Sequence, residues 1–193
     1  MNISSTIEGT RDALPDYARD LKLNLGSVLT TAGAPGLNEK QIWSIALASA
    51  IAARNTAFAR SVEAESRAHL TALDIEGAKA AAAIMGMNNI YYRFLHLVED
   101  GEYQSMPARL RMNVIANHGI DKLDFELISL AVSAVNGCGL CVTSHEKKLR
   151  SHDVSREAIQ SAVRIAATIH AVAGVLAFEQ SAPIAAAASE LAA

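Results

Sequence analysis

Aromatic residues are scarce in this sequence: four Phe, four Tyr and one Trp make up 5% of the chain. Proline is scarce as well, and Pro15, Pro35, Pro107 and Pro183 all fall outside the long apolar stretches that they would otherwise interrupt. Alanine instead supplies much of the 51% hydrophobic content. Because alanine is the best helix former and a poor strand former, this composition excludes an all-β fold and predicts an all-α fold.

Cysteine occurs only twice, and the chain does not need it for stability. A chain of 193 residues can bury roughly 70% of the surface that its unfolded form exposes. It therefore needs neither a disulfide nor a metal to hold a core together, and we expect one domain spanning residues 1–193. The two cysteines require another explanation.

Blocks of like charge and membrane-spanning runs are absent too. The 17 basic and 20 acidic residues are interspersed, so no block could neutralise a phosphate backbone, and we expect no nucleic-acid partner. Arg164 and His170 interrupt the best apolar run before it reaches the roughly 18 residues of a membrane span. Residues 1–14 lack the apolar core of a signal peptide. These features predict a cytoplasmic protein without a membrane partner, where a structural disulfide would be reduced.

An internal similarity organises the chain. The segments SIALASA at residues 44–50 and SLAVSAV at residues 129–135 superimpose at an offset of 85 residues. This offset predicts two copies of a helical unit, about residues 36–92 and 120–178. Each unit has a recognisable helix start, with Asn38 as a capping residue in the first.

The predicted repeat confines the reactive side chains to its second unit. At the offset of 85, Cys138 and Cys141 correspond to Ala53 and Thr56, and His145 corresponds to Arg60. The first unit would then retain the helical scaffold but lack the reactive side chains.

The second unit carries a pattern suited to thiol redox chemistry. Asn136 and Gly137 favour the end of one helix, and a new helix can begin near Cys138. On a helix at 100° per residue, Cys138, Cys141 and His145 then face one way. A Cys-x-x-Cys pair at a helix N-terminus can close a small disulfide, and the free amides there stabilise a thiolate.

Two further side chains complete this predicted site. His145 lies four residues beyond Cys141 and can exchange a proton with the sulfur. Glu126 lies 12 residues before Cys138, so packing of the two helices could bring its carboxylate to His145. A carboxylate that orients an imidazole, which in turn activates a nucleophile, is a recurrent catalytic arrangement.

Other interpretations stay open at this point. Two cysteines on an apolar helix are often inert core residues. A zinc site built from Cys138, Cys141 and His145 lacks an evident fourth ligand, so we predict no metal. Asn88 and Asn89 are two amides in an apolar helical pattern, and they must find partners if they are buried. We expect them to fix a helix crossing or a subunit contact.

Three long motifs in order resemble the alkylhydroperoxidase D (AhpD) family of the carboxymuconolactone decarboxylase-like superfamily. They are AIMGMNNIYYR at residues 83–93, RLRMNVIA at 109–116 and NGCGLCVTSHE at 136–146. The similarity extends over nearly the whole chain, from LPDYARDLKLNL at residues 14–25 to the last long helix.

The resemblance implies an all-α antioxidant enzyme, usually a homotrimer, that reduces alkyl hydroperoxides through a vicinal dithiol. Cys141 would be oxidised to a sulfenic acid, and Cys138 would donate a proton and then close the redox disulfide. Glu126 and His145 match the proton relay of the family. No tightly bound cofactor is implied.

The resemblance also implies two partners. Dihydrolipoamide, carried by a lipoylated acyltransferase, would reduce the disulfide again. The peroxiredoxin component of alkyl hydroperoxide reductase would receive electrons from this dithiol through a mixed disulfide.

One residue departs from the family pattern. Well-characterised members carry histidine immediately before the second cysteine, where this chain has Leu140. This change puts in question how readily the thiolate forms, and it favours the alternative of a redox adaptor that serves the peroxiredoxin with little peroxidase activity of its own. Lactone decarboxylation, suggested by the superfamily name, needs no dithiol, so the complete pair argues against it.

Overall fold

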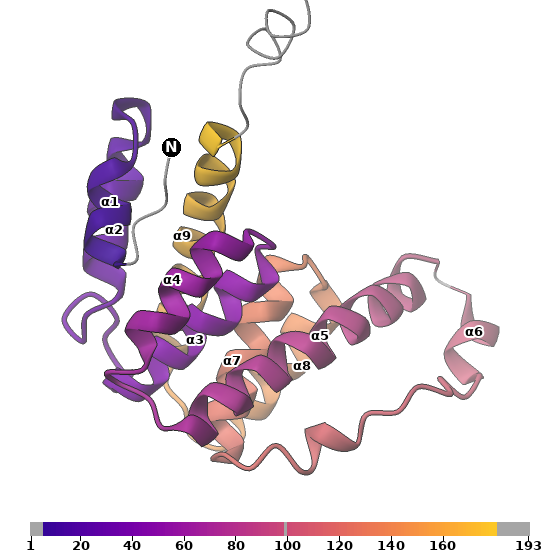
Figure 1. The fold of residues 1–193 in the computed structure, drawn as a ribbon. Coiled ribbons are helices and arrows are strands. Elements are labelled where there is room, and N and C mark those ends of the chain that lie inside the picture. Colours follow the sequence, from indigo (N-terminus) through magenta and orange to yellow (C-terminus); the bar gives the residue numbers. More distant parts are fainter. Residues whose placement is uncertain (1–5, 99, 181–193) are drawn as a thin grey trace, which may run out of the picture.

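The computed structural model describes residues 6–98 and 100–180, and these form helices and connecting segments without a β-strand (Figure 1). The predicted all-α fold is confirmed. The two ends of the predicted domain, residues 1–5 and 181–193, lie outside the described residues. The helices in chain order are α1 (Ile7–Ala13), a 3₁₀ turn (Asp16–Ala18), α2 (Arg19–Val28), α3 (Glu39–Ala52), α4 (Thr56–Ser66), α5 (Ala72–Val98), α6 (Gly101–Ser105), a second 3₁₀ turn (Asn113–Ile115), α7 (Lys122–Val135), α8 (Gly139–Arg150) and α9 (Arg156–Gln180).

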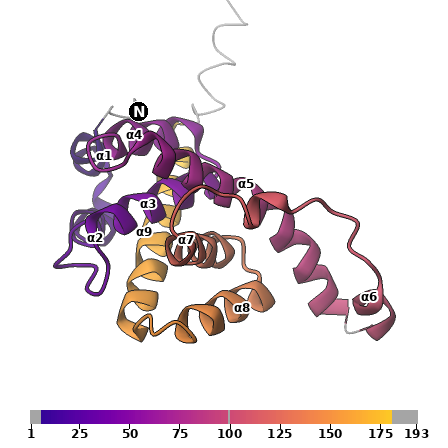
Figure 2. The same cartoon turned by 90° about the horizontal axis from the view of Figure 1, so that it is seen from below.

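The core lies where four long helices meet. Helices α3 and α7 pack against each other and against both α5 and α9, and α7 lies among α3, α5, α8 and α9 (Figure 2). Helix α9 alone is long and apolar enough, among the described residues, to cross a membrane by length and composition. Half of that apolar stretch is buried against the rest of the molecule.

Two successive helix triplets follow each other in the chain. Helices α3, α4 and α5 have 14, 11 and 27 residues, and α7, α8 and α9 have 14, 12 and 25. Their first two helices begin 83 residues apart, at Glu39 and Lys122 and at Thr56 and Gly139. The helix boundaries therefore differ by two residues from the predicted offset of 85, because alanine-rich helices match each other in more than one register.

The helix boundaries place different residues opposite the reactive ones. At a spacing of 83, Cys138 corresponds to Asn55, and both residues are helix N-caps. Cys141 and His145 then correspond to Phe58 and Val62, which are buried apolar side chains. The first triplet thus has neither thiol nor imidazole at these positions.

The helix starts follow local sequence rules. Asn38 accepts a hydrogen bond from Gln41 N, and the Gln41 side chain accepts one from Asn38 N, which completes the predicted capping box of α3. Helix α9 starts similarly, because Ser155 Oγ accepts from Ala158 N at 3.0 Å. Each of these side chains satisfies an amide that the helix itself leaves unpaired.

One segment departs from the compact body. The C-terminal half of α5 and the short α6 project beyond the other helices, and the chain returns through a mostly irregular segment (Figures 1 and 2). Several large apolar side chains on this projecting arm are exposed: Ile90, Phe94, Leu97, Val98, Tyr103 and Met106.

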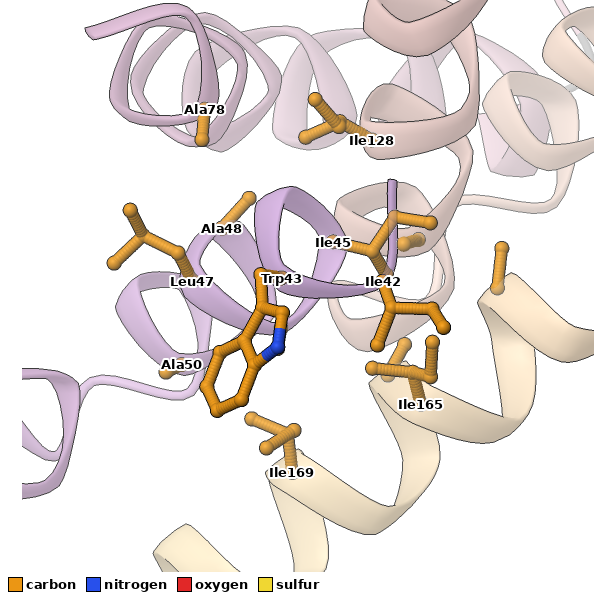
Figure 3. Packing of buried hydrophobic residues seen from close by; sticks show 14 of the residues in the cluster. Ile42, Trp43, Ile45, Leu47, Ala48, Ala50, Ala78, Ile128, Ile165 and Ile169 are labelled. Carbon is orange, nitrogen blue, oxygen red and sulfur yellow. The ribbon is translucent and has the colours of Figure 1, made fainter. Parts of the chain in front are cut away.

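Alanine permits the close approach of the core helices. Ala48 of α3 and Ala78 of α5 are fully buried between their helices, near Ile128 of α7 (Figure 3). Trp43 fills the opposite side of α3 beside Ile169 of α9 (Figure 3). The methyl side chain of alanine occupies little volume, so helices that meet at alanine residues can pack closely. This packing fits the alanine-rich composition of the chain.

Enlarging one of these alanines should destabilise the fold. Ala78→Leu adds three side-chain carbon atoms to a filled crossing, so we expect the free energy of unfolding to fall by about 1–3 kcal/mol. Ala83→Leu, on an exposed position of the same helix, should change it by less than about 0.5 kcal/mol. Urea denaturation monitored by circular dichroism measures both, and equal effects would contradict this account of the packing.

Candidate active site

A single turn ends α7 and begins α8. Gly137 adopts a positive φ of 69°, and its amide donates to Ala134 O at 3.1 Å while Cys138 N donates to Ser133 O at 3.1 Å. This pair of bonds is the Schellman motif, which requires a left-handed residue and therefore favours glycine. This turn therefore fixes the position of Cys138 relative to the end of α7.

Cys138 also immediately precedes the next helix. It is the N-cap of α8, and its Sγ accepts a hydrogen bond from Cys141 N at 3.3 Å. The two cysteines are joined by a disulfide, with Cα atoms 5.3 Å apart. The sequence spacing and the helix start therefore place both sulfurs in the first turn of α8, as predicted.

The two sulfurs differ in their access to solvent. Cys138 is completely buried, whereas Cys141 is 7% exposed and lines a cavity of about 430 Å³. Cys138 is not among the residues that line this cavity. A small molecule in the cavity meets Cys141 first.

His145 and Glu126 form a short contact between α8 and α7. His145 Nδ1 lies 2.7 Å from Glu126 Oε2, and both side chains line the same cavity as Cys141. Lys148 Nζ approaches the other carboxylate oxygen at 3.5 Å. The structure therefore brings together all four residues predicted for the site, Cys138, Cys141, His145 and Glu126.

The carboxylate of Glu126 is held in its charged form. Burial by itself raises the pKa of Glu126, but the hydrogen bond and the electrostatic attraction of His145, together with the charge of Lys148, outweigh it and lower the pKa below its ordinary value of 4.5. An ionised Glu126 can orient the His145 ring and stabilise a proton on it.

Polar side chains of α5 hold the turn in place. Arg93 Nη1 donates to Asn136 O at 2.6 Å. Asn89 Nδ2 donates to Ser133 Oγ, and Asn136 Nδ2 donates to Asn89 Oδ1, each at 2.9 Å. For Asn89 the expected role in fixing a helix crossing is confirmed, because these bonds join α5 to the end of α7.

The cavity beside Cys141 is mostly apolar. Besides the reactive residues, its lining comprises Met85, Asn88, Tyr92, Met112, Ile115, Phe125, Leu140 and Ser144. Tyr92, Met112 and Ile115 were not among the predicted site residues, although all three lie in the motifs at residues 83–93 and 109–116. Leu140 is 42% exposed at this site.

The described residues offer no metal centre. No group of three or more His, Cys, Asp or Glu side chains in residues 6–98 and 100–180 is arranged to hold a metal ion. Both thiols are occupied by the disulfide. The arrangement instead has the parts of a dithiol redox centre: a closed cysteine pair, a helix N-terminus and a carboxylate–imidazole pair.

Known proteins are similar to this chain over most of its length. Alkyl hydroperoxide reductase AhpD of Rhodospirillum centenum is 56% identical over 171 residues, covering 89% of this chain and 90% of that protein. The chain belongs to the AhpD family. The AhpD protein of Gluconacetobacter diazotrophicus is 57% identical over 171 residues, covering 89% and 92%. That of Coxiella burnetii is 53% identical over 165 residues, covering 86% and 93%.

The match to the wider family lies in the second half of the chain. The profile of the Carboxymuconolactone decarboxylase family matches residues 101–189. Within the described residues this match comprises α6 to α9, and so includes the turn at Gly137, both cysteines and the Glu126–His145 pair.

The lowered pKa of Glu126 predicts a pH-dependent contribution to stability. The folded protein favours the ionised carboxylate, so this contribution is complete above the ordinary pKa of 4.5 and is lost as the pH falls through the lower folded value. The difference in unfolding free energy between wild type and Glu126→Gln should therefore shrink from about pH 5 to about pH 3. Denaturant titrations at each pH measure it.

The exposed Glu157 provides the control for this measurement. The difference between wild type and Glu157→Gln should be small at every pH. A difference for Glu126→Gln that grows as the pH falls would contradict the assignment.

Proposed function

We propose that this protein is an antioxidant enzyme that reduces alkyl hydroperoxides with the Cys138–Cys141 dithiol and is reduced again by dihydrolipoamide. The observation that carries the proposal is the disulfide at the N-terminus of α8, with Cys141 and the Glu126–His145 pair in one apolar cavity. The name of the relatives, alkyl hydroperoxide reductase, supplies the substrate class.

The difference in access between the sulfurs supports distinct roles for them. Cys141 reaches the cavity, so its thiolate attacks the distal oxygen of the hydroperoxide; the O–O bond breaks, and a sulfenic acid and an alkoxide form. Cys138 gives its proton to the alkoxide, which leaves as the alcohol. The N-terminal amides of α8 favour the resulting Cys138 thiolate.

The second half of the cycle returns the enzyme to its disulfide and then to its dithiol. The Cys138 thiolate attacks the sulfenic sulfur, and the departing hydroxide takes a proton and leaves as water. A dihydrolipoyl dithiol then reduces the disulfide through a mixed disulfide, and is itself oxidised to the cyclic disulfide. The donor of this group would be a lipoylated acyltransferase.

Glu126 and His145 act on protons in this scheme. Their contact occupies Nδ1 of the imidazole, so Nε2 is the ring nitrogen that draws the proton from the Cys141 thiol. The ionised Glu126 stabilises the imidazolium that forms.

A second function uses the same residues. As a redox adaptor, the dithiol would reduce the disulfide of the peroxiredoxin of alkyl hydroperoxide reductase and turn over little peroxide itself. The exposed Leu140 favours this alternative, because it removes a second imidazole from the thiols and presents an apolar side chain beside Cys141.

The exposed arm supports the homotrimer that family membership suggests. Soluble monomers rarely expose a contiguous group of large apolar side chains such as the one on α5 and α6. We propose that this arm packs against a second copy of the chain, and that the assembly is cytoplasmic.

Cysteine substitutions test the peroxidase cycle. With cumene hydroperoxide and a system that regenerates dihydrolipoamide, Cys141→Ser and Cys138→Ser should each lower turnover more than roughly 100-fold. Cys138→Ser should still form a sulfenic acid that a dimedone probe labels, whereas Cys141→Ser should not, because only Cys141 attacks peroxide.

The same assay separates the enzyme from the adaptor. Negligible peroxide turnover by wild type, together with a mixed disulfide to the peroxiredoxin on a non-reducing gel, would establish the adaptor role. Undiminished turnover in either cysteine variant would exclude the dithiol peroxidase cycle.

Charge on the arm should break the assembly. The double variant Phe94→Lys, Leu97→Lys places two ammonium groups on the proposed contact, so its mass by light scattering should fall from the trimer toward 20.4 kDa, the mass of one chain. Leu23→Lys, on an exposed position of α2 away from the arm, should leave the mass unchanged. A monomeric wild type would refute the proposed contact.

A further inference from the structure

The side-chain oxygen of Asn88 is buried at the proposed active site without a structural role that the fold explains. Its side chain is 4% exposed, and Oδ1 has no hydrogen-bond partner among the described residues. The same residue lines the cavity that contains Cys141 and His145. A buried carbonyl oxygen without a partner costs free energy, so its presence calls for a reason.

The adjacent asparagine shows what a purely structural amide does here. Asn89 donates to Ser133 and accepts from Asn136, so both ends of its carboxamide are paired across the α5–α7 crossing. Asn88, one residue earlier on the same helix, makes no such bond. Both residues are asparagines, but only the side chain of Asn89 makes hydrogen bonds that account for its burial.

The other polar groups of the cavity already have partners or are exposed. Glu126 and His145 bind each other, and Tyr92 Oη lies 3.8 Å from Met112 Sδ. Ser144 is exposed. Asn88 is therefore the buried lining residue whose hydrogen-bonding capacity is left for a ligand.

We infer that the carboxamide of Asn88 binds the hydroperoxide group of the substrate beside Cys141, an inference that rests on the function proposed above. A hydroperoxide has one O–H donor and two acceptor oxygens, which match the acceptor and donor of a carboxamide. Oδ1 accepts the O–H on the distal oxygen, and Nδ2 donates to the proximal oxygen, where charge develops as the O–O bond breaks.

The rest of the lining indicates the carbon part of this substrate. Met85, Met112, Ile115, Phe125 and Leu140 surround the polar groups with apolar surface. A hydroperoxide on an apolar skeleton, such as cumene hydroperoxide, gains contacts there that hydrogen peroxide cannot make. Asn88 anchors the reacting end, and the apolar wall selects the organic end.

Single-turnover kinetics of the full-length protein test the inference. Reduced protein is mixed with cumene hydroperoxide, and loss of free thiols is followed with time. Asn88→Leu, which keeps the approximate size of the side chain but removes both polar atoms, should slow this oxidation roughly 10- to 100-fold. Reduction of its disulfide by dihydrolipoamide should stay within about twofold of wild type, because that step involves no peroxide.

Ser49→Ala is the matched control. Ser49 Oγ is also buried without a hydrogen-bond partner, but it lies on α3 and does not line the cavity. Both substitutions remove an unpaired oxygen, so neither should lower the melting temperature by more than about 2 °C. Only Asn88→Leu should slow peroxide oxidation. If Asn88→Leu does not fold, Asn88→Ala gives the same comparison.

The outcomes separate this inference from the proposed function. Oxidation of both Asn88 variants at the wild-type rate would overturn the role of Asn88 while leaving the dithiol peroxidase intact. An equal loss of oxidation and of re-reduction would also overturn it, because it would indicate a distorted thiol pair. A wild-type dithiol that cumene hydroperoxide does not oxidise would refute the proposed function, and the inference with it.

Discussion

The turn between α7 and α8 is the constraint on which the candidate site depends. Gly137 can take the left-handed conformation that ends α7, and the same turn makes Cys138 the N-cap of α8. Any residue with a Cβ would be strained at that φ, and a longer connection would separate the sulfurs from the helix amides. The bonds from Arg93 and Asn89 fix the turn from α5. The placement of the thiols thus follows from two short-range motifs and one helix crossing.

The second constraint is the packing of α7 against α8. It brings Glu126 to His145 from helices that are separated by the turn, and it keeps both side chains mostly out of solvent. Burial strengthens a hydrogen bond between an imidazole and a carboxylate, because little water competes for either partner. The cavity forms where α5 passes this pair, so Met85, Asn88 and Tyr92 of the first triplet lie on the same cavity as the reactive groups of the second.

Local rules made much of this site predictable from the sequence. The capping box at Asn38 and the helix start at Cys138 depend on neighbouring residues, and so could be read directly. The contact between Glu126 and His145 could be anticipated because the connecting turn is short. The offset between the two helix triplets could not be predicted, since alanine-rich segments can be aligned with one another at several offsets. The sequence did not predict the short helix α1 (Ile7–Ala13).

Tertiary packing decided what local rules could not. Asn88 and Asn89 look alike in the sequence, but only the position of α7 determines which of them is paired. Met112 and Ile115 reach the cavity from an irregular segment whose course no periodicity predicts.

The burial of the disulfide also limits which molecules can open it. Cys138 is fully buried, and Cys141 is 7% exposed at the wall of the cavity, so a thiol on a flat protein surface has poor access to the bond. A thiol on a slender, extended group that enters the cavity has better access to Cys141 than a thiol on the surface of a folded protein. The shape of a donor, as well as its reduction potential, therefore affects how readily it opens this disulfide.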